Sequence, residues 1–176
     1  MKWLPAILFV PLLAAQQFKF NLEHLESKSS NIVDVSLDSS MLQFASRFLS
    51  GKNPDEAKAK KLVSGLEGIY VKSLEFKQDG AWSQADLENV RKQLKAPEWS
   101  RIVGVKSAED GESAEVYIRN VNSKVTGLAV LVTSPREFTV VNIAGPVDLD
   151  SLGDLGGQFG LPKLKVAPGT KDKKFE

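Results

Sequence analysis

Lys124 to Asn142 form the stretch KVTGLAVLVTSPREFTVVN, which decides the fold of this chain. Two apolar, β-branched runs flank the segment Ser134–Glu137, in which Pro135 already has the backbone angle of a tight turn. This pattern predicts a β-hairpin. The first run is apolar without a break from Leu128 to Val132, as is typical of a strand that is central in a sheet or covered on both faces. Other elements are therefore expected to pack over the hairpin.

Four more strands are expected before this hairpin. The connections from Arg101 onward are short, so the last four strands, including the two of the hairpin, should form an antiparallel meander. The four additional strands are Ile32–Leu37, Ile69–Lys77, Arg101–Ser107 and Ala114–Asn120.

Two of these strands show side chains that alternate between two faces. The first strand is expected to be half-buried, with Val33, Val35 and Leu37 on one face. In the strand before the hairpin, one side carries Ala114, Val116 and Ile118, and the other carries Glu115, Tyr117 and Arg119.

Apolar residues at helical spacing predict helices between the strands. The first helix runs to about Lys28 with His24 on its outer side. The second begins at Asp38, an N-cap, and is expected to end at Gly51. The third begins at Asn53-Pro54, an N-cap followed by proline. In the second and third helices, the residues expected to face the core are Met41, Phe44, Ala45, Phe48, Leu49, Ala59, Leu62, Val63 and Leu66.

The clearest local signature precedes the fourth helix. Ser83 and Asp86 have the spacing of a capping box, and Trp82 and Leu87 have the spacing of a hydrophobic staple. Pro97 is expected to end this helix. Trp82 is therefore interpreted as a structural clamp rather than as a platform for a ligand.

Together these elements predict an α+β fold, with a single, mainly antiparallel, twisted sheet of about five or six strands and helices packed on one face. The helix after Ser83 joins two strands and would make one parallel pair if it were a crossover. A single domain, residues 16–162, is expected to hold these elements, with Asp148 as the cap of a last short helix. Residues 163–176 are rich in lysine and are expected to be a disordered tail.

Charge and composition exclude some classes of function. The chain of 176 residues has 23 Lys and Arg against 22 Asp and Glu, a formal net charge of +1. Such a balance gives no electrostatic reason to expect nucleic acid as a partner. The chain has no cysteine, which excludes disulfides, thiolate metal sites and cysteine nucleophiles.

The N-terminus predicts export. Lys2 is followed by the uncharged apolar run Trp3–Ala15, which is shorter than the roughly 20 residues that a membrane-spanning helix needs. These are the features of a signal peptide, residues 1–15, with cleavage after Ala15. The alternative is an uncleaved anchor or an ordinary buried segment. After cleavage no stable membrane span is expected, and the protein is expected in the periplasm or cell envelope.

Residues that carry chemistry are sparse. His24 is the only histidine and is expected to be solvated, so neither a Ser-His-Asp arrangement nor a transition-metal site is indicated. No cofactor is indicated, because neither the phosphate-loop nor the EF-hand pattern is complete in the segment that contains Asp148, Asp150, Gly153, Asp154, Gly156, Gly157 and Gly160. A catalytic carboxylate pair stays open, drawn from Glu75, Asp79, Glu115 and Glu137.

Three residues are candidates for binding or for a structural polar role. Asn142 is a polar side chain within an apolar strand and must find hydrogen bonds if it is buried. It is expected to hold the sheet to a neighbouring segment or to line a small pocket. Tyr117 and Arg119 lie on the polar side of their strand, which is expected to be an uncovered face open to a partner.

Three stretches resemble a known bacterial family, the domain of unknown function DUF4252. They are LVSGLEGIYVKSLEF (62–76), GAWSQADLENVRKQLKAPEWSRIVGVKS (80–107) and VTGLAVLVTSPREFTVVNIAGPVDLDSL (125–152), and the resemblance extends over about Phe20 to Leu161. It implies an exported protein, and some members carry a lipid-attached cysteine that this chain lacks. The resemblance implies no activity and no catalytic or binding residues.

The leading hypothesis is an exported, non-catalytic module that binds a protein partner of the cell envelope or has a regulatory role. An exposed sheet edge would be one place for such a partner. One alternative is a carboxylate-based hydrolase, in which two acids approach in a concave pocket. Another is a small-ligand-binding protein with an apolar pocket between sheet and helices. The sequence leaves the oligomeric state open.

Overall fold

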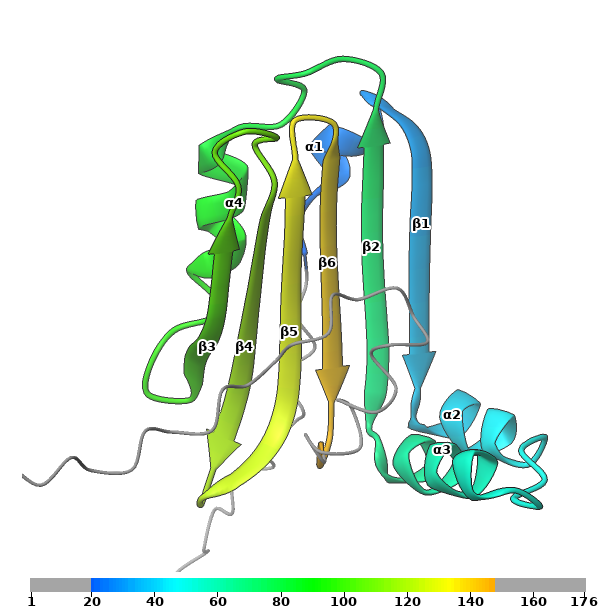
Figure 1. The fold of residues 1–176 in the computed structure, drawn as a ribbon. Helices are drawn as coiled ribbons and strands as arrows, with labels where there is room; N and C mark the ends of the chain where they lie inside the picture. The colour runs from blue at the N-terminus through cyan, green and yellow to red at the C-terminus, as the bar shows by residue number, and fades with distance from the viewer. Residues whose placement is uncertain (1–19, 148–176) are drawn as a thin grey trace, which may run out of the picture.

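The computed structural model describes residues 20–147, which form one sheet and four helices (Figure 1). The α+β fold with a single twisted sheet is therefore confirmed. The expected signal peptide, the helix after Asp148 and the tail at 163–176 lie outside the described residues. In chain order, the elements are α1 Glu23–Glu26, β1 Ser29–Asp38, α2 Ser39–Ser46, α3 Pro54–Gly65, β2 Gly68–Phe76, α4 Gln84–Arg91, β3 Trp99–Lys106, β4 Ser113–Val121, β5 Lys124–Ser134 and β6 Glu137–Ala144.

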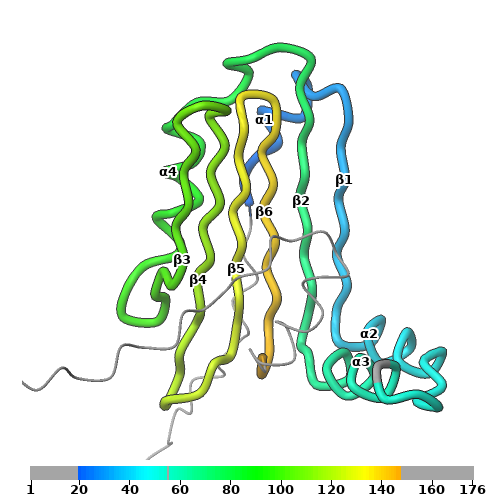
Figure 2. The backbone as a smooth tube through the Cα atoms, in the orientation of Figure 1, coloured from blue at the N-terminus to red at the C-terminus, as the bar shows by residue number. Residues whose placement is uncertain are grey.

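The six strands follow the order β1-β2-β6-β5-β4-β3, and all neighbouring pairs are antiparallel. The predicted hairpin consists of β5 and β6, in which Ser134 pairs with Glu137 across a turn formed by Pro135 and Arg136. The hairpin lies at the centre of the sheet, as its unbroken apolar run indicates (Figure 2). β3, β4, β5 and β6 form the expected meander.

The parallel pair considered for the helix after Ser83 is wrong. β2 and β3 run in the same direction, but β6, β5 and β4 lie between them. The chain crosses one face of the sheet through α4 and reaches the far edge (Figure 1). Within residues 20–147, β3 therefore pairs only with β4.

Some helix boundaries also differ from the prediction. The first helix is a single turn, α1, and begins only at Glu23. α2 ends at Ser46 rather than at Gly51, and α4 ends at Arg91 rather than at Pro97. Gly51 and Pro97 are therefore outer limits for α2 and α4. Each helix ends several residues before its limit.

The face of the sheet that lies against α1 and α4, here called the covered face, carries the larger apolar cluster. Each apolar side chain removed from water stabilises the fold by about 1.5–3 kcal/mol, so this cluster holds both helices on the sheet. Its buried members are Leu22, Leu25, Leu74, Phe76, Leu87, Val90, Leu94, Trp99, Tyr117, Ala129, Leu131, Phe138 and Val140.

The start of α4 has the predicted local structure. Ser83 and Asp86 form the capping box, in which the Ser83 backbone N–H donates to the Asp86 carboxylate at 2.8 Å. The Trp82 ring packs edge-to-face on Phe138, with ring centroids 5.4 Å apart. Its indole N–H donates to the Ser134 carbonyl at 2.8 Å. Trp82 therefore joins the start of α4 to the central hairpin, which is the structural role expected of it.

α2 and α3 pack on each other and project from one end of the sheet, beyond β1 and β2 (Figure 1). Both helices begin at the predicted caps. The Asp38 carboxylate accepts from the backbone N–H of Met41 at 2.9 Å, and the Asn53 side chain accepts from that of Glu56 at 2.7 Å. The expectation of helices packed on one face therefore holds for α1 and α4 but not for this pair.

The inward stripe predicted for α2 is wrong. Leu42 and Ser46 are its buried residues, whereas Met41, Phe44 and Phe48 are exposed. The cause is that α2 begins at the residue directly after β1, without a connecting loop. The end of the strand therefore fixes the rotation of the helix, and it turns Leu42 toward the sheet.

The second apolar cluster lies on the opposite face of the sheet, here called the open face. Leu42 of α2 and Leu66 at the end of α3 cover only one end of it, and no described helix lies across its middle (Figure 1). The remaining buried members are Val116, Leu128 and Val147, and the half-buried residues packed against them include Leu37, Val63, Ile69, Val130 and Ile143.

Gly145 fixes the end of β6 against the end of α3. Its φ is +115°, and a Cβ atom there would lie 2.7 Å from the backbone nitrogen of Glu67 and 3.0 Å from Cα of Leu66. The Glu67 N–H donates to the carbonyl of Ala144 at 2.8 Å. Only glycine fits this approach, so the projecting helices are held to the sheet through backbone contacts.

Candidate functional site

Tyr117 and Arg119 lie on the covered face, so the uncovered face expected around them is wrong. Tyr117 is buried. The Arg119 guanidinium is paired with the Glu98 carboxylate, with Nε at 3.0 Å and Nη2 at 2.9 Å from Oε2. The alternation along β4 is as predicted. Its polar side is buried because Arg91 of α4 and Glu98 of the following loop supply charged partners for it.

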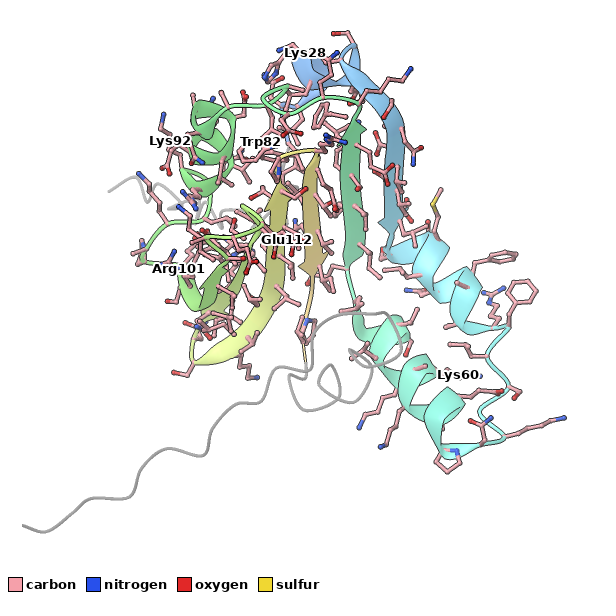
Figure 3. The ribbon with its side chains drawn as sticks, turned by 45° about the horizontal axis from the view of Figure 1, so that its top comes forward. Lys28, Lys60, Trp82, Lys92, Arg101 and Glu112 are labelled. Carbon is pink, nitrogen blue, oxygen red and sulfur yellow. The ribbon has the colours of Figure 1, made fainter. Side chains whose placement is uncertain are left out.

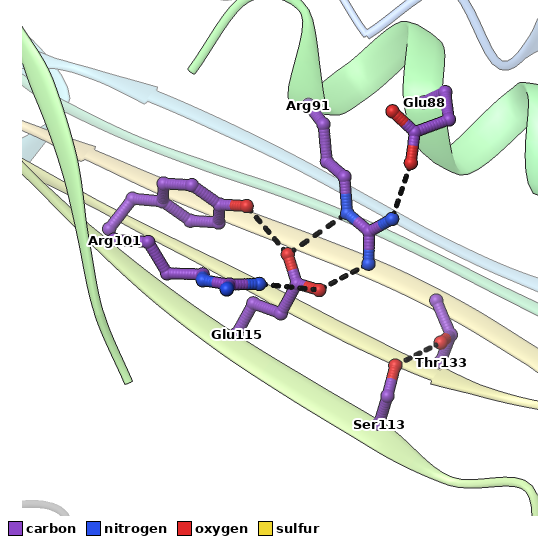
Figure 4. A network of polar contacts seen from close by, with 7 residues as sticks. Glu88, Arg91, Arg101, Ser113, Glu115 and Thr133 are labelled. Carbon is purple, nitrogen blue, oxygen red and sulfur yellow. Dashed lines mark hydrogen bonds and ion pairs between the residues drawn. The ribbon is translucent and has the colours of Figure 1, made fainter. Parts of the chain in front are cut away.

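Glu115 is the centre of a polar network beneath α4 (Figure 4). It is 5% exposed. Its Oε2 accepts from Arg91 Nε at 3.1 Å and from the Tyr117 hydroxyl at 2.6 Å. Its Oε1 accepts from Arg91 Nη2, and Arg101 Nη1 lies 3.6 Å away. Arg91 also donates to Glu88 at 2.5 Å. The fork of Arg91 on this carboxylate is the strong, directional form of an ion pair.

The network holds its members in one charge state. Burial raises the pKa of Glu115, but the hydrogen bonds from Arg91 and Tyr117 outweigh it, so that the pKa lies below its usual value. Burial and the bond to Glu115 raise the pKa of Tyr117 to about 12. A general acid or base works best with a pKa near the operating pH. The pKa values of Glu115 and Tyr117 are both shifted away from pH 7, one downward and the other upward. Their contacts are suited to fastening α4 to β4.

His24 lies at an open groove between α1 and α4. A solvated histidine was expected. The Nε2 atom of this half-exposed side chain lies 2.8 Å from Asp86 Oδ1, so His24 is paired with a carboxylate. The Ser83 hydroxyl donates to Asp86 at 2.7 Å. In a nucleophilic triad the serine hydroxyl donates its hydrogen bond to the histidine. Here the Ser83 hydroxyl donates to the Asp86 carboxylate instead, so His24 does not activate it. The groove has a volume of ≈ 350 Å³ and is lined by Asn21, His24, Asp86, Asn89, Val90 and Gln93.

The four acids from which a catalytic pair was expected do not meet at one place. Glu115 lies in the network under α4, and Asp79 is paired with Arg136 at 2.6 Å. Glu75 and Glu137 stand opposite each other on β2 and β6. They alternate with residues of the covered face and therefore point to the open one. Of these two acids Glu75 is exposed and Glu137 is half-buried, and they are the only two of the four that the fold places opposite each other.

Asn142 is 2% exposed and lies on the covered face, on the same side of β6 as Phe138 and Val140. Its neighbours in the sheet are Tyr70 on β2 and Ala129 on β5. It does not line the groove at His24. A partner cannot reach this side chain from the surface, which favours the structural role over the pocket.

Among residues 20–147, no three His, Asp or Glu side chains converge as metal ligands. The helices in this range are too short or too polar to cross a bilayer.

β1 is an edge strand of ten residues that is open to a binding partner. It pairs with β2, and no described strand lies on its other side. A free strand edge presents a row of unpaired backbone N–H and C=O groups. Pairing with β2 is regular from Asn31 to Asp38, after one irregularity at the start of the strand. Ile32 is 43% exposed, and Val33 is exposed to the same extent.

The other edge, β3, is better protected than β1, whose charged side chains are Asp34 and Asp38. Its pairing with β4 is interrupted in the middle, between Arg101 and Val103. It also carries Gly104, which weakens a strand, and Lys106, a charge that disfavours addition of another strand. β1 has neither lysine nor proline. The alternation in this segment predicts a half-buried strand but not an edge, although the adjacent pair Ile32-Val33 places apolar side chains on both of its faces.

Comparison with known proteins gives a family but no activity. The sequence model of the family described as "Domain of unknown function (DUF4252)" matches residues 24–155. No curated protein sequence matches this chain. Among solved structures, the chain is similar to the Ran-binding protein Mog1p of Saccharomyces cerevisiae, with 16% identity and a TM-score of 0.29. The match covers 65% of this chain and 64% of Mog1p, less than two thirds of that protein. A likeness this weak supports no inference about function.

Proposed function

We propose a function from the surfaces of the molecule, because this chain belongs to the DUF4252 family, whose description names no activity. The protein is an exported component of the cell envelope that binds another protein and catalyses no reaction. Its binding element is the open edge of β1, to which an extended segment of the partner adds as a further strand.

The free edge of β1 is the observation that carries this proposal. Strand addition uses backbone hydrogen bonds for affinity and pockets or apolar side chains on alternate positions for specificity. Ile32 and Val33 provide one exposed apolar side chain on each face of the strand. The strand is also held firmly on its inner side, where Lys72 of β2 bridges Asp34 and Glu26. The edge is thus preformed and needs little ordering when a partner strand arrives.

The polar side chains elsewhere support a binding role over a catalytic one. The charged groups under α4 are bonded to each other, and the histidine is bonded to a helix cap. Export is supported by residues 1–15, which have the pattern of a signal peptide.

A matched pair of substitutions tests the binding element. Ile32→Lys puts a charge on the open edge, and Ile102→Lys puts the same charge on the protected edge, where the isoleucine is similarly exposed at 49%. We expect Ile32→Lys to lower capture of the partner from crosslinked envelope extracts by about tenfold or more, and Ile102→Lys to leave it unchanged. Adding the captured partner should also slow hydrogen exchange in β1. Equal capture by both variants would contradict the proposal.

Export has its own test. The protein recovered from the periplasm or envelope fraction should have the mass of residues 16–176, because cleavage after Ala15 leaves Gln16 as the first residue. A cytosolic protein that retains Met1 to Ala15 would disprove export and leave the role of β1 to the capture experiment.

A further inference from the structure

The middle of the open face is apolar and lies under no described helix. On β6 this face carries Val141 and Ile143, which alternate with the buried Asn142 of the covered face. Figure 3 shows α3, marked by Lys60, beyond the end of the sheet, so the helix pair leaves these strands uncovered. The apolar neighbours on the same face include Leu128, Val130 and Val132 on β5, Val116 and Ile118 on β4, and Ile69 and Val71 on β2.

A face of this composition is typical of a sheet that is covered on both sides. Strands with apolar residues on both faces occur mainly in such sheets, and β5 is apolar without a break from Leu128 to Val132. Val130 and Ile143 are nevertheless only half-buried. One layer is therefore needed to complete the packing of the described residues.

The described chain ends on this open face. After β6, the Gly145 N–H donates to the Thr126 carbonyl at 3.0 Å, and the Val147 N–H donates to the Val125 carbonyl at 3.2 Å. Val147 is 7% exposed and belongs to the cluster of the open face. At the other end of the described range, Phe20 packs against the cluster of the covered face. The segment after Val147 is thus the one that begins beside the uncovered apolar strands.

Residues 148–159, DLDSLGDLGGQF, have the pattern of an amphipathic helix. Asp148 is suited to the N-cap position, and Asp150 and Asp154 would lie on the polar side. The family model extends to residue 155, so most of this segment belongs to the same unit as the sheet. At 100° per residue, an arc of about 120° contains all four large apolar side chains, which are Leu149, Leu152, Leu155 and Phe159.

We propose that residues 149–159 dock on the open face as an amphipathic helix and complete the packing of the sheet. Their apolar side contacts the strands, and their acidic side faces water. A helix of this length is about 16 Å long, which equals about five residues of a strand. Starting from Val147, it covers the apolar part of the face and ends before Ser73 and Thr139. There the face becomes polar, and the two hydroxyls bond to each other at 2.7 Å.

The covalent attachment favours this segment over a second copy of the chain. Val147 is already held in the open-face cluster, so docking is intramolecular and has a high effective concentration. In isolation the helix is weak, because it is short and Gly153, Gly156 and Gly157 disfavour it. The sheet supplies the packing that such a helix lacks in water.

The lack of cysteine permits a crosslinking test in the full chain. Leu152→Cys carries a benzophenone maleimide on the side that faces the sheet, and Asp154→Cys carries it on the opposite side. After irradiation, mass spectrometry of the digested monomer should find the label at 152 joined to β5 or β6. The label at 154 should be joined to neither strand.

Two matched double substitutions measure the docking itself by urea unfolding. Leu152→Ser with Leu155→Ser removes two side chains from the apolar side and should raise the equilibrium constant of unfolding by about tenfold or more. Asp150→Ser with Asp154→Ser makes the same replacement on the outer side and should change it by no more than about twofold. Only the leucine variant should increase the fluorescence of a dye that binds exposed apolar surface.

Three results would overturn the proposal. One is a crosslink from position 152 to α1, to α4 or to residues 1–19 in place of β5 and β6. The second is a crosslink between two chains whose yield grows with protein concentration, which would identify a second copy as the cover. The third is the same equilibrium constant of unfolding in both double variants. Ile32→Lys should leave the crosslinks unchanged, so this test is separate from that of β1.

Discussion

α2 and α4 share a length and the pattern of a capped amphipathic helix, but their apolar sides are placed oppositely. Each has eight residues, an N-cap and apolar side chains at helical spacing. α4 buries its apolar residues Leu87 and Val90 against the sheet. α2 turns Phe44 to the outside, and Phe48 in the turn directly after the helix is exposed as well.

The difference lies in what precedes each helix. α4 is separated from β2 by a loop, and Trp82 at the end of this loop fixes the helix on the central hairpin. α2 continues directly from β1, so its rotation follows the strand. An amphipathic pattern therefore shows that a helix has an apolar side, while the attachment of the helix decides whether the core or an external surface receives that side.

The largest expected effect is in α4. Leu87→Ala removes a buried side chain from the cluster between α4 and the sheet, and we expect a loss of about 2–5 kcal/mol in the free energy of unfolding. Urea unfolding followed by fluorescence measures it. Leu87→Met keeps the volume and should cost less than about 1.5 kcal/mol. If Leu87→Ala lost less than about 1.5 kcal/mol, α4 would not be fastened to the sheet through this side chain.

Next in size is the network under α4. Glu115→Ala leaves Arg91 without its buried partner, and since Arg91 is partly solvated we expect a loss of about 2 kcal/mol. Arg136→Ala breaks the exposed pair with Asp79 and should change stability by less than about 1 kcal/mol. Equal losses in the two variants would show that the network is no stronger than a surface ion pair.

The same network predicts a dependence on pH. The pKa of Glu115 in the folded protein lies below the value of 4.5 that an unperturbed glutamate has. Its contribution to stability is therefore present above the pKa of the unfolded chain and is lost as the pH falls through the folded pKa. Glu115→Gln should be less stable near neutrality and should lose less stability than the wild type on acidification. Parallel curves of stability against pH would contradict this.

A smaller effect is expected at the cap of α4. Ser83→Ala removes the hydroxyl of the capping box, and we expect a loss of about 1 kcal/mol. Ser83→Thr keeps a hydroxyl and should recover most of it. Thermal unfolding measures both variants, and an alanine variant as stable as the wild type would show that Asp86 alone caps the helix.

The smallest effect is expected in α2. Phe44→Ser with Phe48→Ser changes side chains that are mostly in solvent, and stability should change by no more than about 0.5 kcal/mol. A loss as large as that of Leu87→Ala would break the comparison, because the two helices would then both be core elements.

Local signals made part of this fold predictable. Pro135 between two apolar runs indicates the hairpin, and the unbroken run from Leu128 indicates its central place. The spacing of Ser83 and Asp86 indicates the start of α4. Each of these signals lies within a few residues of the structure that it predicts.

The rest depends on contacts between distant parts of the chain. No local pattern shows that Arg91 reaches Glu115 and allows the polar side of β4 to be buried. The free edge of β1 follows from the strand order, in which β2 is the only described neighbour of β1. The polar side of β4 made Tyr117 and Arg119 look like exposed binding residues, but α4 and the loop that follows it cover them.

The pairing of β2 with β6 has a consequence for how the chain assembles. β6 is the last described strand to leave the ribosome, and until it does, β2 has only β1 as a neighbour. A two-stranded ribbon is at best marginally stable in water. Nearly the whole of residues 20–147 must therefore be synthesised before the sheet can close. Late closure of this kind would leave the strands without their final neighbours through most of the synthesis of the chain.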